Sequence, residues 1–376
     1  MESTAVSHLH PAGSFTVADH SAPSGREEVW RFTPTNRLAD FFDPAIARGQ
    51  LEITSEAGGA YPGLSLREAP RRTALTPVDL PAAIAAGVDA APYVKIEGTV
   101  AEPIRLSVRP GSVEPDVRVD PTAGHIVLEA TPGSSATVVL THTGLVRHIE
   151  NVEIIVGDGA TLTVVTIQDW DRGSIHLGQH EALVGPNATY RHIAVSLGGD
   201  IVRLQNNVSY AAAGGQADLL GVYFADAGQH LEHRLFVDHN QPKGVSHADY
   251  RGALQGDKAR SVWIGDVLIR PEAQGIQTYE SNKNLILTDG CRADAVPNLE
   301  IETGQIVGAG HSASTGRFDE EQLFYLESRG IDPEEARRLV VRGFFAAILA
   351  KIGIADVETM LLARVDAELA AAANAH

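Results

Sequence analysis

From about residue 100 the chain consists of short apolar runs separated by turns, and no helical pattern interrupts them for about two hundred residues. Runs such as TVVLTHT, VEIIVGDGATLTVVTIQ, YRHIAVSL and SVWIGDVLI are rich in Val, Ile, Leu and Tyr, and Gly and Asp residues separate them. Alternation of apolar and polar residues between turn signals is typical of β-strands. The sequence therefore predicts a mainly β core over residues 101–317.

A loose repeat runs through this core, because a small residue in a turn repeatedly precedes a new strand. The aligned small residues are Ala136, Ala160, Ala188, Ala217 and Ala259. Most steps between them are 24 to 29 residues, and the last step of 42 would require an insertion. The next such segment, DGCRADAV, places Cys291 at the alanine position. A repeat of this length made of strands and turns favours a parallel β-helix. A Greek-key sandwich is the alternative, since alternation and turns fit both.

The two ends of the chain have a different character. Residues 1–25 are rich in Ser, Ala, Gly, Pro and His without periodicity, which predicts a disordered tail. Residues 26–100 predict a small helical or mixed unit, with a short helix over 26–42 and helical character at 77–87. Residues 318–376 predict a C-terminal helical domain.

The second helix of this C-terminal domain carries two apolar stripes. One stripe contains Ala336, Val340, Phe344 and Ala347; the other contains Val341, Phe345, Ile348 and Ile352. A helix that is apolar on more than one face is buried on more than one side. One side can pack on its own domain, and we expect the other to meet a partner chain.

Composition excludes several classes of function. The formal net charge of −18 disfavours binding to nucleic acid or to an anionic membrane. The start of the chain lacks the pattern of a signal peptide, and the most apolar stretch, 339–355, is interrupted by Arg342 and Lys351. The single cysteine, Cys291, allows no internal disulfide, as in a reducing compartment. These features predict a cytoplasmic protein.

Motifs for common enzyme chemistry are absent from the sequence. No lysine follows a glycine, so there is no phosphate-binding GxxxxGK[ST] loop, and GxSxG, HExxH and CxxC are also missing. The pair Asp169 and Asp171 could serve a β-helix carbohydrate lyase or hydrolase, although acids at a strand end are more often a solvated turn.

Four histidines fall within eighteen residues, at positions 230, 233, 239 and 247. Imidazole is a common metal ligand, but His230 and His233 would point to opposite faces of a strand. We therefore interpret the four as structural.

A chain with one cysteine cannot hold an iron–sulfur cluster alone, because such clusters ordinarily have four ligands. If Cys291 or His311 binds iron, the remaining ligands must come from another molecule.

Residues 205–331 resemble the SufB/SufD family of iron–sulfur cluster assembly proteins, and within it the SufD branch. The similar segments are QNNVSY, GQHLEHRLFVDHNQPKGVSH, YRGALQGDKARSVWIGDVLI, AQGIQTYESNKNLIL, ADAVPNLEIE and GHSASTGRFDEEQLFYLESRGI. EEVWRFTP near the start is similar to the family's N-terminal Trp-Arg-Tyr-Thr-Pro element, with Phe32 in place of Tyr.

This resemblance implies a right-handed parallel β-helix between helical ends and a non-catalytic scaffold role. It implies a SufB-like partner bound through the core and a SufC-like ATPase bound by the C-terminal helices. Phe344, Phe345, Val341 and Ile348 are then the predicted docking residues. The chain would have no nucleotide site of its own, and in isolation it could form a homodimer.

The resemblance also implies a metal-binding role for His311, at the SufB interface where a transient, shared iron–sulfur cluster forms. SufD chains often carry Cys-x-His here, whereas this chain has Ala309 in place of that cysteine. Cys291 falls where SufB has its interface cysteine, so either it supplies a thiolate ligand or it is a buried repeat residue. A passive structural solenoid is a further alternative.

Overall fold

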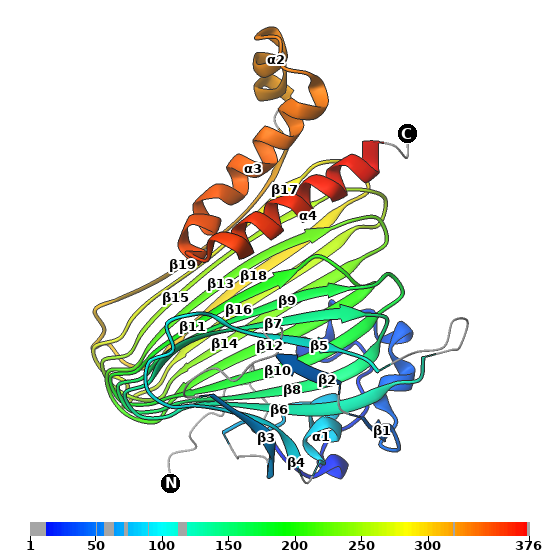
Figure 1. Cartoon of the computed structure of the whole chain (residues 1–376). Helices are drawn as coiled ribbons and strands as arrows, with labels where there is room; N and C mark the ends of the chain where they lie inside the picture. Colours follow the sequence, from blue (N-terminus) through cyan, green and yellow to red (C-terminus); the bar gives the residue numbers. More distant parts are fainter. Residues whose placement is uncertain are drawn as a thin grey trace.

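A computed structural model describes residues 13–49, 51–55, 64–70, 74–88, 90–111, 119–318 and 320–373. The strands in these ranges form a 10-stranded sheet, called here sheet A, and a 9-stranded sheet, called sheet B (Figure 1). Sheet A contains β1 (Ala47–Arg48), β3 (Leu64–Pro70), β4 (Ala90–Ile96), β6 (Thr122–Ala130), β8 (Arg147–Val156), β10 (Ile175–Val184), β12 (Ile201–Tyr210), β14 (His230–His239), β16 (Arg260–Ile269) and β18 (Arg292–Ile301). Sheet B contains β2 (Glu52–Ser55), β5 (Ile104–Arg109), β7 (Ser135–Gly144), β9 (Thr161–Trp170), β11 (Thr189–Ser196), β13 (Gln216–Ala225), β15 (Val245–Leu254), β17 (Gln277–Ile286) and β19 (Gly308–Arg317).

The order of the strands confirms the predicted parallel β-helix. From β4 onward the chain alternates between the sheets, and each strand pairs in parallel with the strand two places along the chain. Each turn takes 26 residues where Ile175 lies beside Ile201 and 32 residues where Arg260 lies beside Arg292. The long step in the alanine repeat is not an insertion, because Ala217 lies in sheet B and Ala259 precedes a strand of sheet A.

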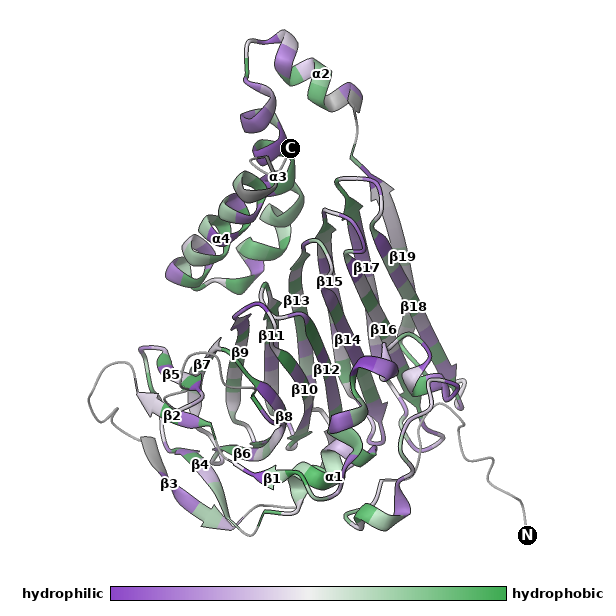
Figure 2. Cartoon of the chain, turned by 90° about the vertical axis from the view of Figure 1, so that its right-hand side faces the viewer, coloured by the Kyte–Doolittle hydropathy of each residue, from purple (hydrophilic) through white to green (hydrophobic). Residues whose placement is uncertain are grey.

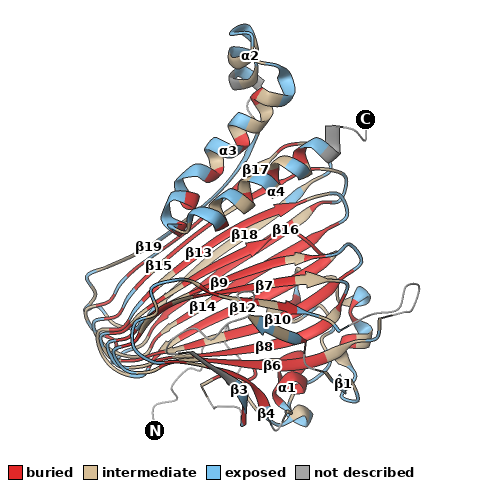
Figure 3. Cartoon of the chain, viewed as in Figure 1, coloured by how far each residue is buried: buried red, intermediate tan, exposed pale blue. Residues whose placement is uncertain are grey.

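Alternation of side chains divides each strand between the interior of the β-helix and its outer faces. The interior contains one continuous cluster that includes Val152, Leu204, Leu219, Tyr250 and Trp263. Figure 3 shows that buried residues fill the middle turns. Since both faces of the middle strands are covered, their sequences read as nearly continuous apolar runs.

A layer of N-terminal segments covers the outer face of sheet A. It contains the 3-10 helices η1 (Val17–Asp19), η2 (Glu28–Trp30), η3 (Thr35–Arg37) and η4 (Ala39–Phe42) and the helix α1 (Leu80–Ala86). Trp30, Phe41 and Ile84 pack here against Ile149 and Leu177. Where a short helix broken at Pro34 was expected over residues 26–42, the chain forms three short 3-10 helices, one before Pro34 and two after it. Of the predicted tail, residues 1–12 lie outside the described residues, and 13–25 include η1.

Two of the three C-terminal helices cover the outer face of sheet B. They are α3 (Pro333–Ile352) and α4 (Ala355–Ala373), whereas α2 (Glu320–Ser328) stands away from the sheets in both Figures 1 and 2. The Asp332 side chain caps α3 by accepting from the Glu334 amide, and Gly353, at φ 68°, ends the helix in the left-handed conformation. None of the helices in the described ranges has the length and apolarity needed to cross a membrane.

Candidate functional site

The last turn of the β-helix is formed by β18 and β19, and no other element of the described residues covers its open side. All central residues of β18 are half-buried, and most of β19 is exposed, including its inward-facing Ala313 and Thr315 (Figure 3). β18 and β19 are also the last strands of their sheets, so the described residues leave one side of each without a neighbour. An open β-edge presents backbone groups that can pair with another chain.

His311 lies in this open turn, at the fourth position of β19. Its neighbour in the register is Glu280 of β17, and both side chains point to the inner side of the β-helix. The His311 Nδ1 and Glu280 Oε1 atoms are 4.0 Å apart. The His311 side chain is 43% exposed, whereas that of Glu280 is 2% exposed. The pair therefore joins a buried carboxyl group to a ring that an outside molecule can reach.

Glu280 sits in a space that glycine leaves open on the opposite sheet. A Cβ atom at Gly265 would lie 2.2 Å from Glu280 Oε2 and 2.5 Å from the Trp263 ring. Burial, and to a smaller degree the neighbouring Asp266, raises the pKa of the Glu280 carboxyl to about 8. Asp266 itself is bonded by the Asn298 side-chain amide at 2.6 Å.

Cys291 lies in the turn before β18, next to Ala259 of the preceding turn in the register. Its Sγ contacts Thr288 Oγ1 at 3.5 Å and the Gly256 carbonyl oxygen at 3.3 Å. The side chain is half-buried against the interior cluster, and burial raises the pKa of the thiol. This location agrees with its place in the alanine repeat and leaves both roles considered for Cys291 open.

The structure places Cys291 and His311 on opposite sides of the open turn. The Cys291 turn lies near the end of β19, where Arg317 and Asp289 form an ion pair at 2.7 Å. His311 comes six residues before Arg317 in the same strand. At the rise of a β-strand, the two residues are therefore roughly 20 Å apart. Within the described part of the chain, no group of three or more His, Cys, Asp or Glu side chains could hold a metal ion.

Three of the four clustered histidines are buried, and they point in different directions as expected. His230 Nε2 lies 3.0 Å from the outward-facing carboxylate of Glu232. Although burial opposes ionisation of Glu232, His230, Arg203 and Arg234 lower its pKa to about 2. On the inner side, His233 stacks on Tyr223, and His239 bonds Ser246 Oγ at 2.8 Å. The half-exposed fourth, at position 247, lies 3.3 Å from Asp218.

Asp169 and Asp171 lie at the end of β9 and have different surroundings. Asp169 forms an ion pair with Arg364 of α4 at 2.6 Å, and Asp171 lies in the turn after β9.

A separate buried cluster joins the Glu150 carboxylate to the His142 ring at 3.0 Å and to the His176 ring at 3.7 Å. Burial opposes the charge on Glu150, but the two rings hold its pKa well below the usual range.

The predicted docking residues occupy a different environment from the one expected. Val341, Phe345 and Ile348 are buried in the cluster between α3, α4 and sheet B. Phe344 is half-buried, and its carbonyl oxygen accepts a hydrogen bond from Arg251 at 2.7 Å. These side chains therefore attach the helix to its own chain, and substituting Phe345 would disturb folding before it disturbed binding.

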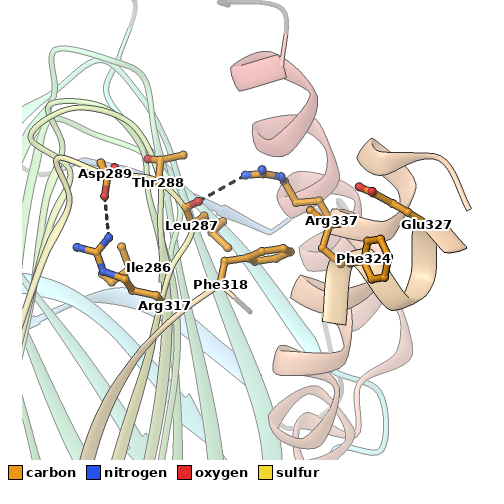
Figure 4. Close-up of a pocket in the computed structure, with 10 residues that line it drawn as sticks. Ile286, Leu287, Thr288, Asp289, Arg317, Phe318, Phe324, Glu327 and Arg337 are labelled. Atoms are coloured by element: carbon orange, nitrogen blue, oxygen red, sulfur yellow. Dashed lines mark hydrogen bonds and ion pairs between the residues drawn. The ribbon is translucent and has the colours of Figure 1, made fainter. Parts of the chain in front are cut away.

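In the described part of the C-terminal domain, the large apolar side chains that are exposed lie on α2 and at one position of α3. They are Phe324 at 72% exposure, Tyr325 at 56% and Leu339 at 40%. Beside α2 is a groove of about 410 Å³, lined by Leu287, Phe318, Phe324 and Arg337, among others (Figure 4). Arg337 bonds the Leu287 carbonyl oxygen at 3.4 Å across its floor. This surface, rather than the buried stripe of α3, is available to a partner.

Sequence reasoning missed Glu280 as a site residue. The run QTYESNKN has polar residues at alternate positions, namely Thr278, Glu280, Asn282 and Asn284, where other strands have apolar residues. That alternation is the signal from which an inward-facing polar strand could have been predicted. The apolar LFYL segment of α2 was visible in the sequence, but its exposure was not.

The family model and the similar proteins found by comparison all name the same family. A family model described as SUF system FeS cluster assembly, SufBD core domain, matches residues 116–344, which is more than half of the chain. The chain is 49% identical over 368 residues to an iron–sulfur cluster assembly SufBD family protein of Mycobacterium tuberculosis, covering 95% of this chain and 91% of that protein. A Mycobacterium leprae protein of the same description is 46% identical over 378 residues, covering 97% and 95%. The iron–sulfur cluster assembly protein SufD of Bacillus subtilis is 27% identical over 249 residues, covering 64% and 56%.

Proposed function

The chain belongs to the SufBD family of iron–sulfur cluster assembly proteins, and from that premise we propose that it is a SufD-type, non-catalytic scaffold subunit. It pairs with a SufB-type chain and carries a SufC-type ATPase. A nascent iron–sulfur cluster forms as transient cargo at the contact between the two scaffold chains. The observation that carries this proposal is the open last turn, which presents His311 above a buried carboxylate.

The open turn supports pairing with a second scaffold chain. The free edges of β18 and β19 offer backbone hydrogen-bonding groups, and β19 has small residues, such as Gly310 and Ser312, that allow close approach. His311 alone cannot complete a metal site, so the partner chain would supply further ligands. Cys291 would contribute a thiolate to a separate position on the same contact, because it lies on the opposite side of the turn.

The C-terminal helices support docking of the ATPase. We propose that Phe324 and Tyr325 of α2, with Leu339 of α3, form the contact, since these side chains are exposed. Motion of the ATPase would then reach the open turn through Phe318, which links β19 to α2 and packs beside Arg337. A cytoplasmic location belongs to the same proposal and is based on the single cysteine.

The proposal is tested by affinity purification of the tagged chain from its native cell extract. We expect a SufB-like chain and two copies of a P-loop ATPase per scaffold pair, counted by mass spectrometry. In the double variant Phe324→Asp, Tyr325→Asp the scaffold partner should remain and the ATPase bound to this chain should be lost, because charge is placed in an apolar contact. Thermal unfolding should not change, since both positions are exposed.

Leu145→Asp is the matched control, because Leu145 is also an exposed apolar residue but lies in the turn between β7 and β8. It should retain both partners. Recovery of the wild-type chain with neither partner would refute the scaffold proposal. A double variant that keeps its full share of ATPase would refute the docking surface alone.

A further inference from the structure

Glu280 is a buried acid without the partner that such a group normally has. Its side chain is 2% exposed, and Oε1 finds no hydrogen-bond donor in the described residues. Across those residues, no Lys or Arg forms an ion pair with it, and the His311 ring, whose Nδ1 lies 4.0 Å from Oε1, is the basic group within reach. Leaving a buried polar group without a partner costs free energy, so the position of Glu280 needs a physical explanation, and a bound ion would supply one.

The surroundings of Glu280 hold its carboxylate in place. Gly265 gives it room, since any larger residue there would meet Oε2, and the Trp263 ring closes the same side. Trp263 is itself fully buried. One oxygen of the Glu280 carboxyl group, Oε2, therefore lies in the space at Gly265, and the other, Oε1, lies 4.0 Å from His311 Nδ1 in the next turn.

We propose that Glu280 and His311 form a two-ligand half-site for ferrous ion, in which the buried carboxylate binds the metal beside the imidazole. This inference rests on the proposed function, and it adds Glu280 as the second ligand of this chain. Imidazole nitrogen and carboxylate oxygen together suit divalent iron. Atoms bound to one metal at about 2.0–2.2 Å lie roughly 3 to 4 Å apart, so only a small movement of either side chain is needed.

The half-site is incomplete within the chain, in agreement with the absence of a three-ligand group from the described residues. The remaining positions face the open side of the last turn, where a second scaffold chain or sulfide can supply ligands. Iron bound in this way is cargo, because two protein ligands from this chain hold it less tightly than the four of a structural site. Position 309 is an alanine, so Glu280 is the side chain of this chain that can stand beside His311 as a second ligand.

The test uses the complete complex, purified without iron under anaerobic conditions, and titrates it with ferrous ion in equilibrium dialysis. Glu280→Gln keeps the size of the side chain and removes the charge. We expect the complex to assemble as before, by size-exclusion chromatography, and the affinity for ferrous ion to fall at least tenfold. Glu300→Gln is the matched control: Glu300 lies in β18 of the same open turn, half-buried and facing outward, and its loss should leave the affinity unchanged.

His311→Ala separates failure of this inference from failure of the proposed function. If His311→Ala weakens binding of ferrous ion and Glu280→Gln does not, the carboxylate is no ligand and the inference is overturned while the scaffold function stands. If neither substitution weakens binding, His311 is not at the metal site and both fail. Should Glu280→Gln not assemble, Glu280→Asp decides: withdrawing the carboxylate by one methylene group should also weaken binding, and an unchanged affinity overturns the pairing.

Discussion

Individual turn residues of the β-helix set how the chain passes from one sheet to the other. Most of these turns contain a glycine in the left-handed region, such as Gly159 at φ 63° and Gly290 at φ 83°. Lys258 adopts the same conformation at φ 60°, in the turn before β16. A side chain with a Cβ atom is strained there, by about 1–2 kcal/mol, so this position carries a local cost.

Lys258→Gly should therefore stabilise the chain by about 1 kcal/mol. Little is lost with the side chain, which is 84% exposed and makes only a 3.5 Å contact with Asp257, itself 74% exposed. The measurement is urea-induced unfolding of the isolated chain: the urea concentration at the midpoint should rise, while the dependence of the unfolding free energy on urea concentration stays the same. Lys283→Gly, on the outer side of β17, is the control and should destabilise, because glycine weakens a strand interior. A lower midpoint for Lys258→Gly would contradict the expectation.

Buried glutamate side chains of sheet A attach one of the segments that cover its outer face. The segment 74–79 is held by Glu153, which accepts from the Leu75 amide at 3.3 Å, and by Glu181, which accepts from the Thr76 amide at 3.2 Å. Glu153 and Glu181 are neighbours in the register of β8 and β10. Burial, which outweighs these hydrogen bonds, raises the pKa of Glu181 to about 7. The segment is thus attached through a group that titrates near neutrality.

A raised carboxyl pKa makes stability depend on pH in a defined direction. The contribution of Glu181 is fully present below its usual pKa of 4.5 and is lost as the pH rises through about 7. The loss amounts to at most about 3 kcal/mol. Glu181→Gln cannot ionise, so it should be the more stable protein at pH 8 and should lose less stability between pH 5 and 8. Chemical unfolding at the two pH values measures this difference.

Glu272→Gln is the control for this pH series, because Glu272 is exposed in the turn before β17. It should follow the wild type at both pH values. The pKa of Glu280 is also raised, so the wild type and Glu181→Gln both lose stability through Glu280 as the pH rises. The quantity to compare is therefore the difference between the unfolding free energies of the two proteins at each pH. If that difference is the same at pH 5 and pH 8, Glu181 is already ionised in the folded protein and the argument fails.

The same elements show what could be predicted from the sequence. The β-helix followed from alternation and turn spacing, both of which are local properties of strands. Alternation does not tell which of two sheets a strand joins, so Ala217 and Ala259 were aligned although Ala217 lies in sheet B and Ala259 precedes a strand of sheet A. Nor could it show that Phe345 is buried and Phe324 exposed, because the orientation of a helix depends on tertiary packing. Glu280 and His311 are 31 residues apart, and only the register of β17 and β19 brings them together.

The molecule as a whole has two unlike ends. At the N-terminal end, β2 and β3 pair antiparallel with β5 and β4, so the parallel stacking stops there. At the other end the stacking stops at β18 and β19 without such a closing strand in the described residues. A repeat structure with an uncovered terminal turn exposes interior surface and tends to associate through it. We therefore expect another chain to cover this end.

In the absence of another scaffold chain, we expect two copies of this chain to associate through their open ends. Ala313→Asp should prevent this, because Ala313 is exposed although it faces the inner side of the last turn, and each copy would bring a charge into the contact. Sedimentation of the isolated wild-type chain should show a dimer at micromolar concentration, and the variant should sediment as a folded monomer. Ala346→Asp, on the exposed face of α3, should remain dimeric. A wild-type chain that is monomeric at every concentration would show that the open end needs a different partner, and a dimeric Ala313→Asp would place the contact elsewhere.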